Sequence, residues 1–63
     1  MPLVQITMLT GRTADQKRKV AKRITDALVE DAGAPREATV VVFHEVSKEN
    51  YASGGELVID KGK

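Results

Sequence analysis

The chain has 63 residues, one histidine, no cysteine and a formal net charge of +1. Nucleic-acid-binding proteins usually carry a strong basic excess and aromatic side chains on which bases stack, so a near-neutral chain with one Phe and one Tyr argues against that class. A compact fold of this size hides only about 60% of the surface of its unfolded chain, and no disulfide can compensate. We therefore expect one domain, residues 1–63, stabilised as a homo-oligomer.

The sequence also gives no sign of a membrane or export segment. Its longest uncharged apolar run, around Val40 to Phe43, is far too short to span a bilayer. The first residues do not combine a basic segment with a following apolar stretch, as a signal peptide would. We expect a cytoplasmic protein that does not act at a membrane.

A strand followed by a helix is expected first. Residues 2–9 alternate between two faces, with Val4, Ile6 and Met8 on one and Leu3, Gln5 and Thr7 on the other. Thr13 and Gln16 then have the spacing of a capping box at a helix start, and Gly33 with Pro35 predicts the helix end. Between them, apolar residues recur at helical spacing: Val20, Ile24, Ala27 and Leu28. The basic residues between Lys17 and Arg23 are expected on the solvated helix face.

Residues 39–46, with the sequence TVVVFHEV, predict a second strand that is covered on both faces. Strand, helix and strand in this order imply a parallel pair, and hence an α/β (α+β) fold made of a single β-α-β unit. Both edges of such a pair are open, so we expect oligomerisation through sheet extension. Gly54-Gly55, within residues 47–63, indicates a short C-terminal hairpin or arm that reaches a neighbour.

Candidate catalytic groups are few. His44 lies inside the second strand, where a packed or surface histidine is more common than a functional one. Pro2 follows Met1 directly, and a small residue at this position commonly permits removal of the initiator Met. The product would be a secondary amine, and α-amino groups have a reference pKa of about 7.7–8.0, which apolar surroundings lower. Such an amine can act as a general acid and base, although Pro2 could also simply begin an edge strand.

The residues around Pro2 carry a resemblance. The pattern Pro2-Leu3-Val4-Gln5-Ile6, then Leu9, Gly11-Arg12-Thr13 and Gln16-Lys17, resembles the 4-oxalocrotonate tautomerase family. The tail segment Tyr51-Ala52-Ser53-Gly54-Gly55-Glu56-Leu57 resembles it too, and the likeness covers almost the whole chain without gaps. It implies protomers that pair into a four-stranded sheet, with the dimers assembled into a hexamer.

The resemblance also implies an activity and its residues. Pro2 would be the general base and then the general acid in the ketonisation of a 2-hydroxydienoate or related enol, without a metal or organic cofactor. Arg12 matches the arginine that binds a substrate carboxylate from another subunit, a task that suits the planar guanidinium fork. Tyr51 matches an aromatic wall of the pocket and Leu9 a pocket-lining residue. The expected partners are a small enol or 2-oxo acid substrate and further copies of the chain.

One position departs from the family pattern. A second family arginine, which grips the other carboxylate, falls at Val40 here. Its loss removes a charged contact that is typically worth about 1.5–3 kcal/mol, and Arg36 lies more than about 10 Å away in an extended chain. A weaker or differently specific enzyme is therefore expected. The alternative is a non-catalytic oligomeric protein of the same fold that binds a small carboxylate or a protein partner.

Overall fold

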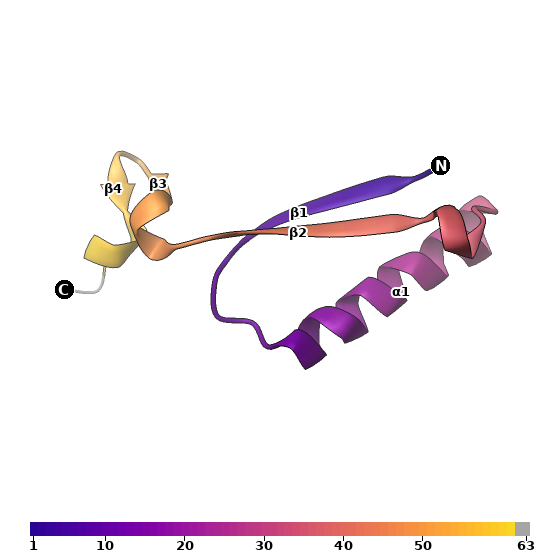
Figure 1. Ribbon diagram of the computed structural model, residues 1–63. Coiled ribbons are helices and arrows are strands. Elements are labelled where there is room, and N and C mark those ends of the chain that lie inside the picture. Colours follow the sequence, from indigo (N-terminus) through magenta and orange to yellow (C-terminus); the bar gives the residue numbers. More distant parts are fainter. Residues whose placement is uncertain (62–63) are drawn as a thin grey trace.

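The computed structural model describes residues 1–61, so the last two residues of the expected 1–63 domain lie outside the described part. Figure 1 shows the order of the elements along the chain. The strands and the helix are β1 (Leu3–Leu9), α1 (Ala14–Ala32), β2 (Val40–Val46), β3 (Ala52–Ser53) and β4 (Glu56–Leu57). Short 3-10 turns cover Arg36–Ala38, Lys48–Asn50 and Val58–Asp60.

β1 and β2 form the parallel pair that the sequence predicts. Leu3 pairs with Val40 at one end and Leu9 with Val46 at the other, without a bulge. The backbone N–H of Val40 donates to the carbonyl of Pro2 at 3.0 Å, which extends the ladder by one bond before β1 begins. The helix joins the two strands, so the β-α-β unit is confirmed.

Both ends of α1 have the expected local chemistry. The hydroxyl of Thr13 accepts from the backbone N–H of Gln16 at 3.1 Å, and the Gln16 side chain accepts from the Thr13 N–H at 2.9 Å. This reciprocal capping box satisfies two N–H groups that the first helical turn leaves free. At the other end, Gly33 adopts a left-handed conformation with φ 69°, which costs little without a Cβ atom.

The side of α1 that faces the sheet differs from the expected one. Ala21, Ile24 and Leu28 are half-buried, whereas Val20 and Ala27 are exposed on the flank of the helix. Lys17 completes the inward side, where its ammonium group pairs with the carboxylate of Glu45 on β2. Val20 and Ala27 follow the helical spacing, but each residue advances about 100° around the helix. Their side chains therefore lie about a quarter turn away from the side that faces the sheet.

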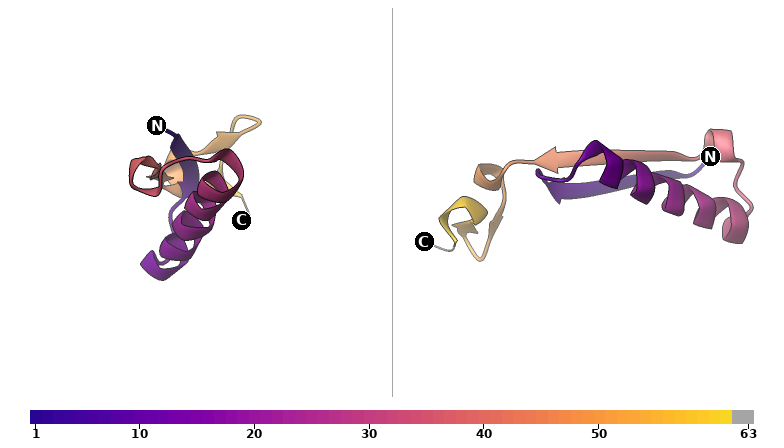
Figure 2. Two further views of the ribbon diagram at one scale, coloured as in Figure 1. Left: turned by 90° about the vertical axis from the view of Figure 1, so that its right-hand side faces the viewer. Right: turned by 90° about the horizontal axis from the view of Figure 1, so that it is seen from below.

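Successive residues of a strand point to opposite faces, so the pairing register assigns two faces to the sheet. One face packs against α1, which lies along one side of the strand pair (Figure 2). We call the other the open face, and its members are Leu3, Gln5, Thr7 and Leu9 from β1 and Val40, Val42, His44 and Val46 from β2. Leu3 is 56% exposed there and Val40 37%. The apolar run of β2 is thus covered on one face only within a single copy.

A single copy of the chain lacks a fully buried residue anywhere in residues 1–61. Its extents are 46 × 23 × 15 Å, and its radius of gyration is 15.1 Å. A compact chain of this length would have a radius of gyration of about 10.6 Å. The elongation comes partly from the C-terminal arm, residues 47–61, which extends beyond the carboxyl end of β2 (Figure 1). The structure is therefore that of a protomer with an incomplete core.

The arm contains the hairpin that Gly54-Gly55 indicates. β3 and β4 pair in antiparallel fashion, with Ala52 opposite Leu57, and both glycines of the connecting turn have positive φ, 60° and 81°. A side chain at either position would be strained, since L residues rarely adopt this conformation. Within residues 1–61, the one long helix lacks the apolar length that crossing a membrane requires.

Candidate functional site

Pro2 lies at the amino end of the strand pair and is half-buried. Its carbonyl is held by the N–H of Val40, so this backbone is ordered by the sheet. The nitrogen of Pro2 is a peptide nitrogen as long as Met1 is attached, and Met1 is 92% exposed. Removal of Met1 would therefore disturb no packed contact and would leave a secondary amine beside the apolar residues Leu3 and Val40.

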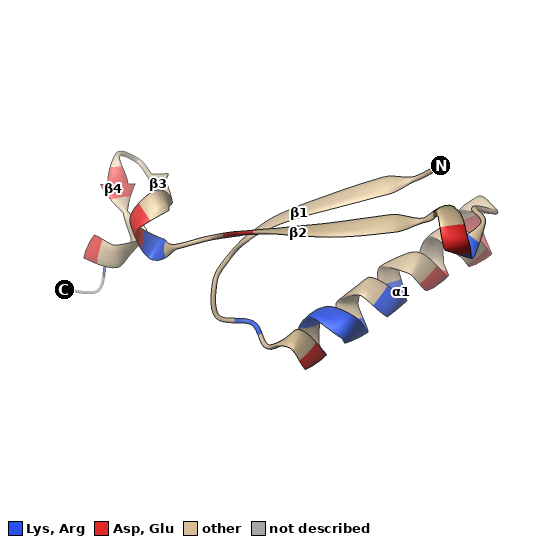
Figure 3. Cartoon of the chain, in the orientation of Figure 1, with Lys and Arg blue, Asp and Glu red and all other residues tan. Residues whose placement is uncertain are grey.

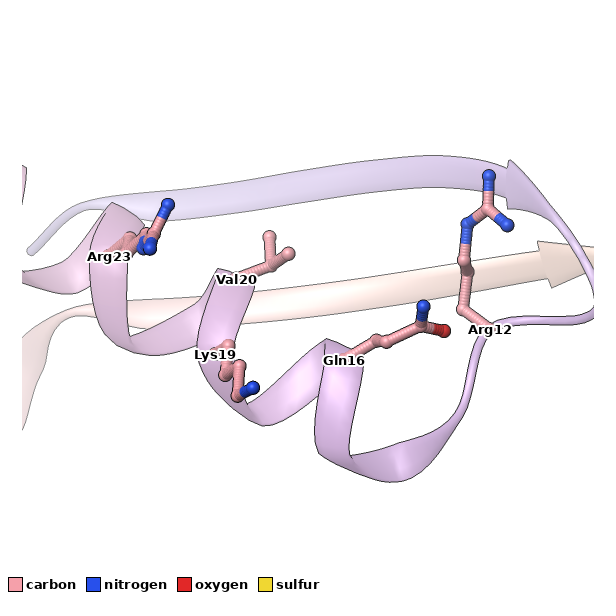
Figure 4. A pocket seen from close by; sticks show the side chains of 5 residues that line it. All are labelled: Arg12, Gln16, Lys19, Val20 and Arg23. Atoms are coloured by element: carbon pink, nitrogen blue, oxygen red, sulfur yellow. The ribbon is translucent and has the colours of Figure 1, made fainter.

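Arg12 lies at the opposite end, in the loop between β1 and α1. It is exposed, and none of the ion pairs among residues 1–61 involves its guanidinium. It borders a shallow depression of about 320 Å³ on the flank of α1 (Figure 4). The depression is lined by Arg12, Gln16, Lys19, Val20 and Arg23. An unpaired guanidinium in such a place can accept an incoming carboxylate in a bidentate manner without first breaking an ion pair.

A smaller recess lies between this flank and the sheet. It has a volume of about 70 Å³, and Arg12, Gln16 and Val20 line it as well. The remaining lining comes from Met8, Lys17 and Phe43, so its floor is largely apolar. Figure 4 shows that the side chains of Arg12, Val20 and Arg23 project toward the same side of the helix.

Leu9 lies at the carboxyl end of the strand pair, and Tyr51 lies in the arm beyond that end. Leu9 is the last residue of β1 and is half-buried, and the next N–H, that of Thr10, donates to Val46 at 2.9 Å. In the arm, the carbonyl of Tyr51 accepts from the N–H of Val58 at 2.8 Å, and the residue is 45% exposed. An aromatic ring this exposed in the arm is available to contact another chain.

One copy of the chain does not bring the four predicted site residues together. β1 has seven residues and rises about 3.3 Å per residue, so roughly 20 Å separate Pro2 from Leu9 and Arg12. The arm, which contains Tyr51, extends farther along the same direction (Figure 1). A side chain spans only part of that gap. Any site that contains both Pro2 and Arg12 must combine different copies of the chain.

Arg36 is committed elsewhere. It lies in the turn before β2, and its guanidinium donates to Asp26 of α1 at 2.7 Å. Lys22 donates to the other carboxylate oxygen of Asp26 at 2.8 Å. These two hydrogen bonds, first from Lys22 and then from Arg36, lower the pKa of Asp26 below its ordinary value of 3.8. Arg36 therefore joins the turn to the helix within this copy.

Gln16, Lys19 and Arg23 were not among the predicted site residues, yet they share the depression with Arg12. Helical periodicity could have indicated these residues, because positions 16, 19, 20 and 23 lie on one flank of a helix. Figure 3 shows that basic residues gather in the first half of α1 and that acidic residues increase toward its end. The sequence pattern predicts that this charge lies on the solvated helix face, and its position next to Arg12 also makes this end of the protomer attractive to anions.

Comparison with known proteins identifies the family. Residues 2–61 match the model of the family described as tautomerase enzyme. A probable tautomerase from Bacillus cereus is 48% identical over 97% of this chain and 100% of its own length. The 2-hydroxymuconate tautomerase of Comamonas testosteroni is 43% identical over the full length of both chains. The chain therefore belongs to the tautomerase family.

Solved structures agree with the fold. A crystal structure of a 4-oxalocrotonate tautomerase homologue covers 100% of both chains with a TM-score of 0.93 at 33% identity. A heterohexameric 4-oxalocrotonate tautomerase from Chloroflexus aurantiacus covers 97% of this chain and 98% of its own, with a TM-score of 0.87 at 28% identity. The resemblance seen in the sequence is confirmed, as is the β-α-β fold that it implied.

Proposed function

We propose that this chain catalyses the conversion of an enol carboxylate, such as a 2-hydroxydienoate, into its keto form, with the amine of Pro2 as the proton carrier. The observation that carries the proposal is membership of the tautomerase family over residues 2–61, a match that begins at Pro2. The relative from Comamonas testosteroni, matched over its full length, is a 2-hydroxymuconate tautomerase. The substrate class proposed here follows from that relative.

The proton transfer needs only a neutral secondary amine. After Met1 is removed, the Pro2 nitrogen takes the proton of the enol hydroxyl while the oxygen forms the carbonyl double bond. The electrons of the former carbon–carbon double bond then form a new C–H bond with that proton, which the Pro2 ammonium returns. The proton is conserved and no redox change occurs, so one group serves as base and then as acid. Apolar surroundings in an assembled site would favour the neutral amine, because they disfavour a charge.

Arg12 is proposed to hold the substrate carboxylate, with Leu9 and Tyr51 as apolar walls. The guanidinium is exposed and free of carboxylate partners within residues 1–61, which suits recognition of an external anion. Because Pro2 and Arg12 lie at opposite ends of the protomer, the substrate site would form between copies. The missing core of the single copy supports such an assembly, and a homohexamer in the cytoplasm is the form we propose.

Ketonisation can be followed by the loss of enol absorbance with 2-hydroxymuconate and phenylenolpyruvate as substrates. Arg12→Ala is expected to lower kcat/KM at least tenfold, which corresponds to the roughly 1.5–3 kcal/mol of a charged hydrogen bond. The free energy of unfolding should change by no more than about 0.5 kcal/mol, since Arg12 is exposed. Arg18→Ala is the matched control, because Arg18 is exposed on α1 and already paired with Asp15.

The two variants separate the possible outcomes. An unchanged kcat/KM in Arg12→Ala would remove Arg12 from the site. Equal losses in Arg12→Ala and Arg18→Ala would indicate a general effect of surface charge on substrate approach. If the purified wild-type chain, freed of Met1, ketonises neither enol, the non-catalytic alternative of the same fold replaces the proposal.

A further inference from the structure

The basic residues between positions 12 and 23 fall into two groups. Three of them form ion pairs with carboxylates of the chain: Lys17, Arg18 and Lys22. The others belong to no ion pair within residues 1–61, and they all line the depression on the flank of α1: Arg12, Lys19 and Arg23. We propose that this depression binds a small organic anion with two acidic groups, one held at Arg12 and the other at Lys19 and Arg23.

The spacing of the cations indicates the shape of the ligand. Arg12 and Gln16 lie toward one end of the depression and Arg23 lies at the other, with Lys19 between them (Figure 4). A helix rises about 1.5 Å per residue, so about 10 Å separate the backbones of Gln16 and Arg23 along the axis. A ligand whose two acidic groups are joined by a chain of several atoms would compensate both ends of this row better than one compact anion.

Like charges lie side by side on this flank without a compensating carboxylate. Lys19 and Arg23 are four residues apart, and side chains at this spacing are neighbours on a helix, where like charges are destabilising. None of the ion pairs within residues 1–61 includes either residue. A local arrangement that costs stability is typical of a functional site. An acidic group between the two side chains would replace their repulsion with two attractive contacts.

The uncharged part of the lining suits the middle of such a ligand. Val20 is 40% exposed and supplies apolar surface for a carbon chain. The side-chain oxygen of Gln16 accepts from the Thr13 N–H in the capping box, which leaves the amide nitrogen of Gln16 able to donate to a carboxylate. The volume of about 320 Å³ lies within the range of about 300–1,000 Å³ that is usual for small-molecule sites.

This subsite rests on the proposed function and narrows the substrate class of the same site. When Arg12 holds one carboxylate of the substrate, a chain that runs along the flank of α1 brings its far end to Lys19 and Arg23. An enol carboxylate with an acidic group at its far end is therefore preferred over one that ends in an apolar group. Lys19 and Arg23 determine this preference and take no part in the proton transfer.

Isothermal titration calorimetry with octanedioate and octanoate tests the subsite without catalysis, because the two ligands differ in one carboxylate and neither contains an enol. The wild-type chain should bind octanedioate at least about fivefold more tightly than octanoate, as two exposed charged contacts allow. The double variant Lys19→Gln/Arg23→Gln should lose this difference and keep its affinity for octanoate. Arg18→Gln/Lys22→Gln is the matched control, since it removes the same charge from α1 at residues that already have carboxylate partners.

The outcomes separate the subsite from its alternatives. Equal affinities of the wild-type chain for the two ligands, or equal losses in the two double variants, would overturn the inference. Sedimentation velocity of Lys19→Gln/Arg23→Gln adds a further test. If this variant dissociates where the wild-type chain is an oligomer, the cations pair with carboxylates of another copy, which would also overturn the inference. Selective binding of octanedioate by a chain that ketonises no enol would support the subsite and count against the proposed catalytic function alone.

Discussion

Val40 is the residue at which the sequence resemblance implies a second substrate-binding arginine, and the structure places Val40 next to Pro2. Its N–H donates to the Pro2 carbonyl, and the residue is 37% exposed on the open face. The nearest arginine along the chain, Arg36, is held by Asp26 at 2.7 Å. The amino end of the strand pair therefore offers apolar surface where a second substrate carboxylate would need a cation.

Val40→Arg should shift the preference of the enzyme toward dicarboxylate enols. The new guanidinium would supply a charge-assisted contact, and kcat/KM for 2-hydroxymuconate should rise by about tenfold relative to phenylenolpyruvate, which has one carboxylate. Steady-state kinetics with both enols measures the ratio. Val40→Met, of similar length but uncharged, serves as the control. A ratio that is the same in Val40→Arg and Val40→Met would show that the charge at this position does not set specificity.

Among the elements, α1 is joined to the turn before β2 by one carboxylate. Asp26 accepts from Lys22 within the helix and from Arg36 in the turn. Because the pKa of Asp26 is lowered in the folded protein, the stabilising effect is fully present above the ordinary value of 3.8. It is lost as the pH falls through the lower folded value, where the carboxylate takes up a proton.

Asp26→Asn should therefore lower the Tm at pH 7 and have less effect at pH 3. Differential scanning calorimetry of wild-type and variant protein at the two pH values measures the difference. Asp31→Asn is a suitable control, since Asp31 lies on the same helix and none of the ion pairs of residues 1–61 includes it. A decrease in Tm that is equally large at pH 3 would mean that packing of the side chain, rather than its charge, is what Asp26 contributes.

The elements themselves could be predicted because their signals are local. The capping box of Thr13 and Gln16, the left-handed Gly33 and the alternation in β1 depend on neighbours within a few residues, and all three are present in the structure. The side of α1 that faces the sheet is harder to predict. Val20 and Ala27 follow the helical period as well as Ile24 and Leu28 do, and only the position of the sheet decides which pair turns inward.

The sequence proposes a set of site residues, but it carries no information on how these residues are arranged in space. Pro2, Leu9, Arg12 and Tyr51 come from the family pattern, whereas the register of β1 with β2 is what places Pro2 at one end and the others at the opposite end. Periodicity and composition carry no information on how copies meet. The pairing of Arg36 with Asp26 was also beyond the sequence, since it joins residues ten positions apart through a turn.

At the scale of the whole molecule, the incomplete core predicts self-association. Without a fully buried residue in its described part, the single copy lacks the apolar burial that offsets the entropy of folding. Native mass spectrometry at low micromolar concentration should show a stable oligomer, with six copies as the expected number. Dilution should unfold the chain as it dissociates, which circular dichroism can follow. A folded, stable monomer at that concentration would contradict this expectation.

The proposed proton carrier is a free amine on Pro2, and comparison of two forms of the same chain tests this role most directly. One form retains Met1 and the other lacks it, and intact mass spectrometry distinguishes them. Met1 is 92% exposed, so the two forms should have the same oligomeric state. We expect ketonisation only in the form without Met1, with a rate that rises with pH through one ionisation at or below the usual α-amine range of about 7.7–8.0. Equal rates in the two forms would show that Pro2 is not the base.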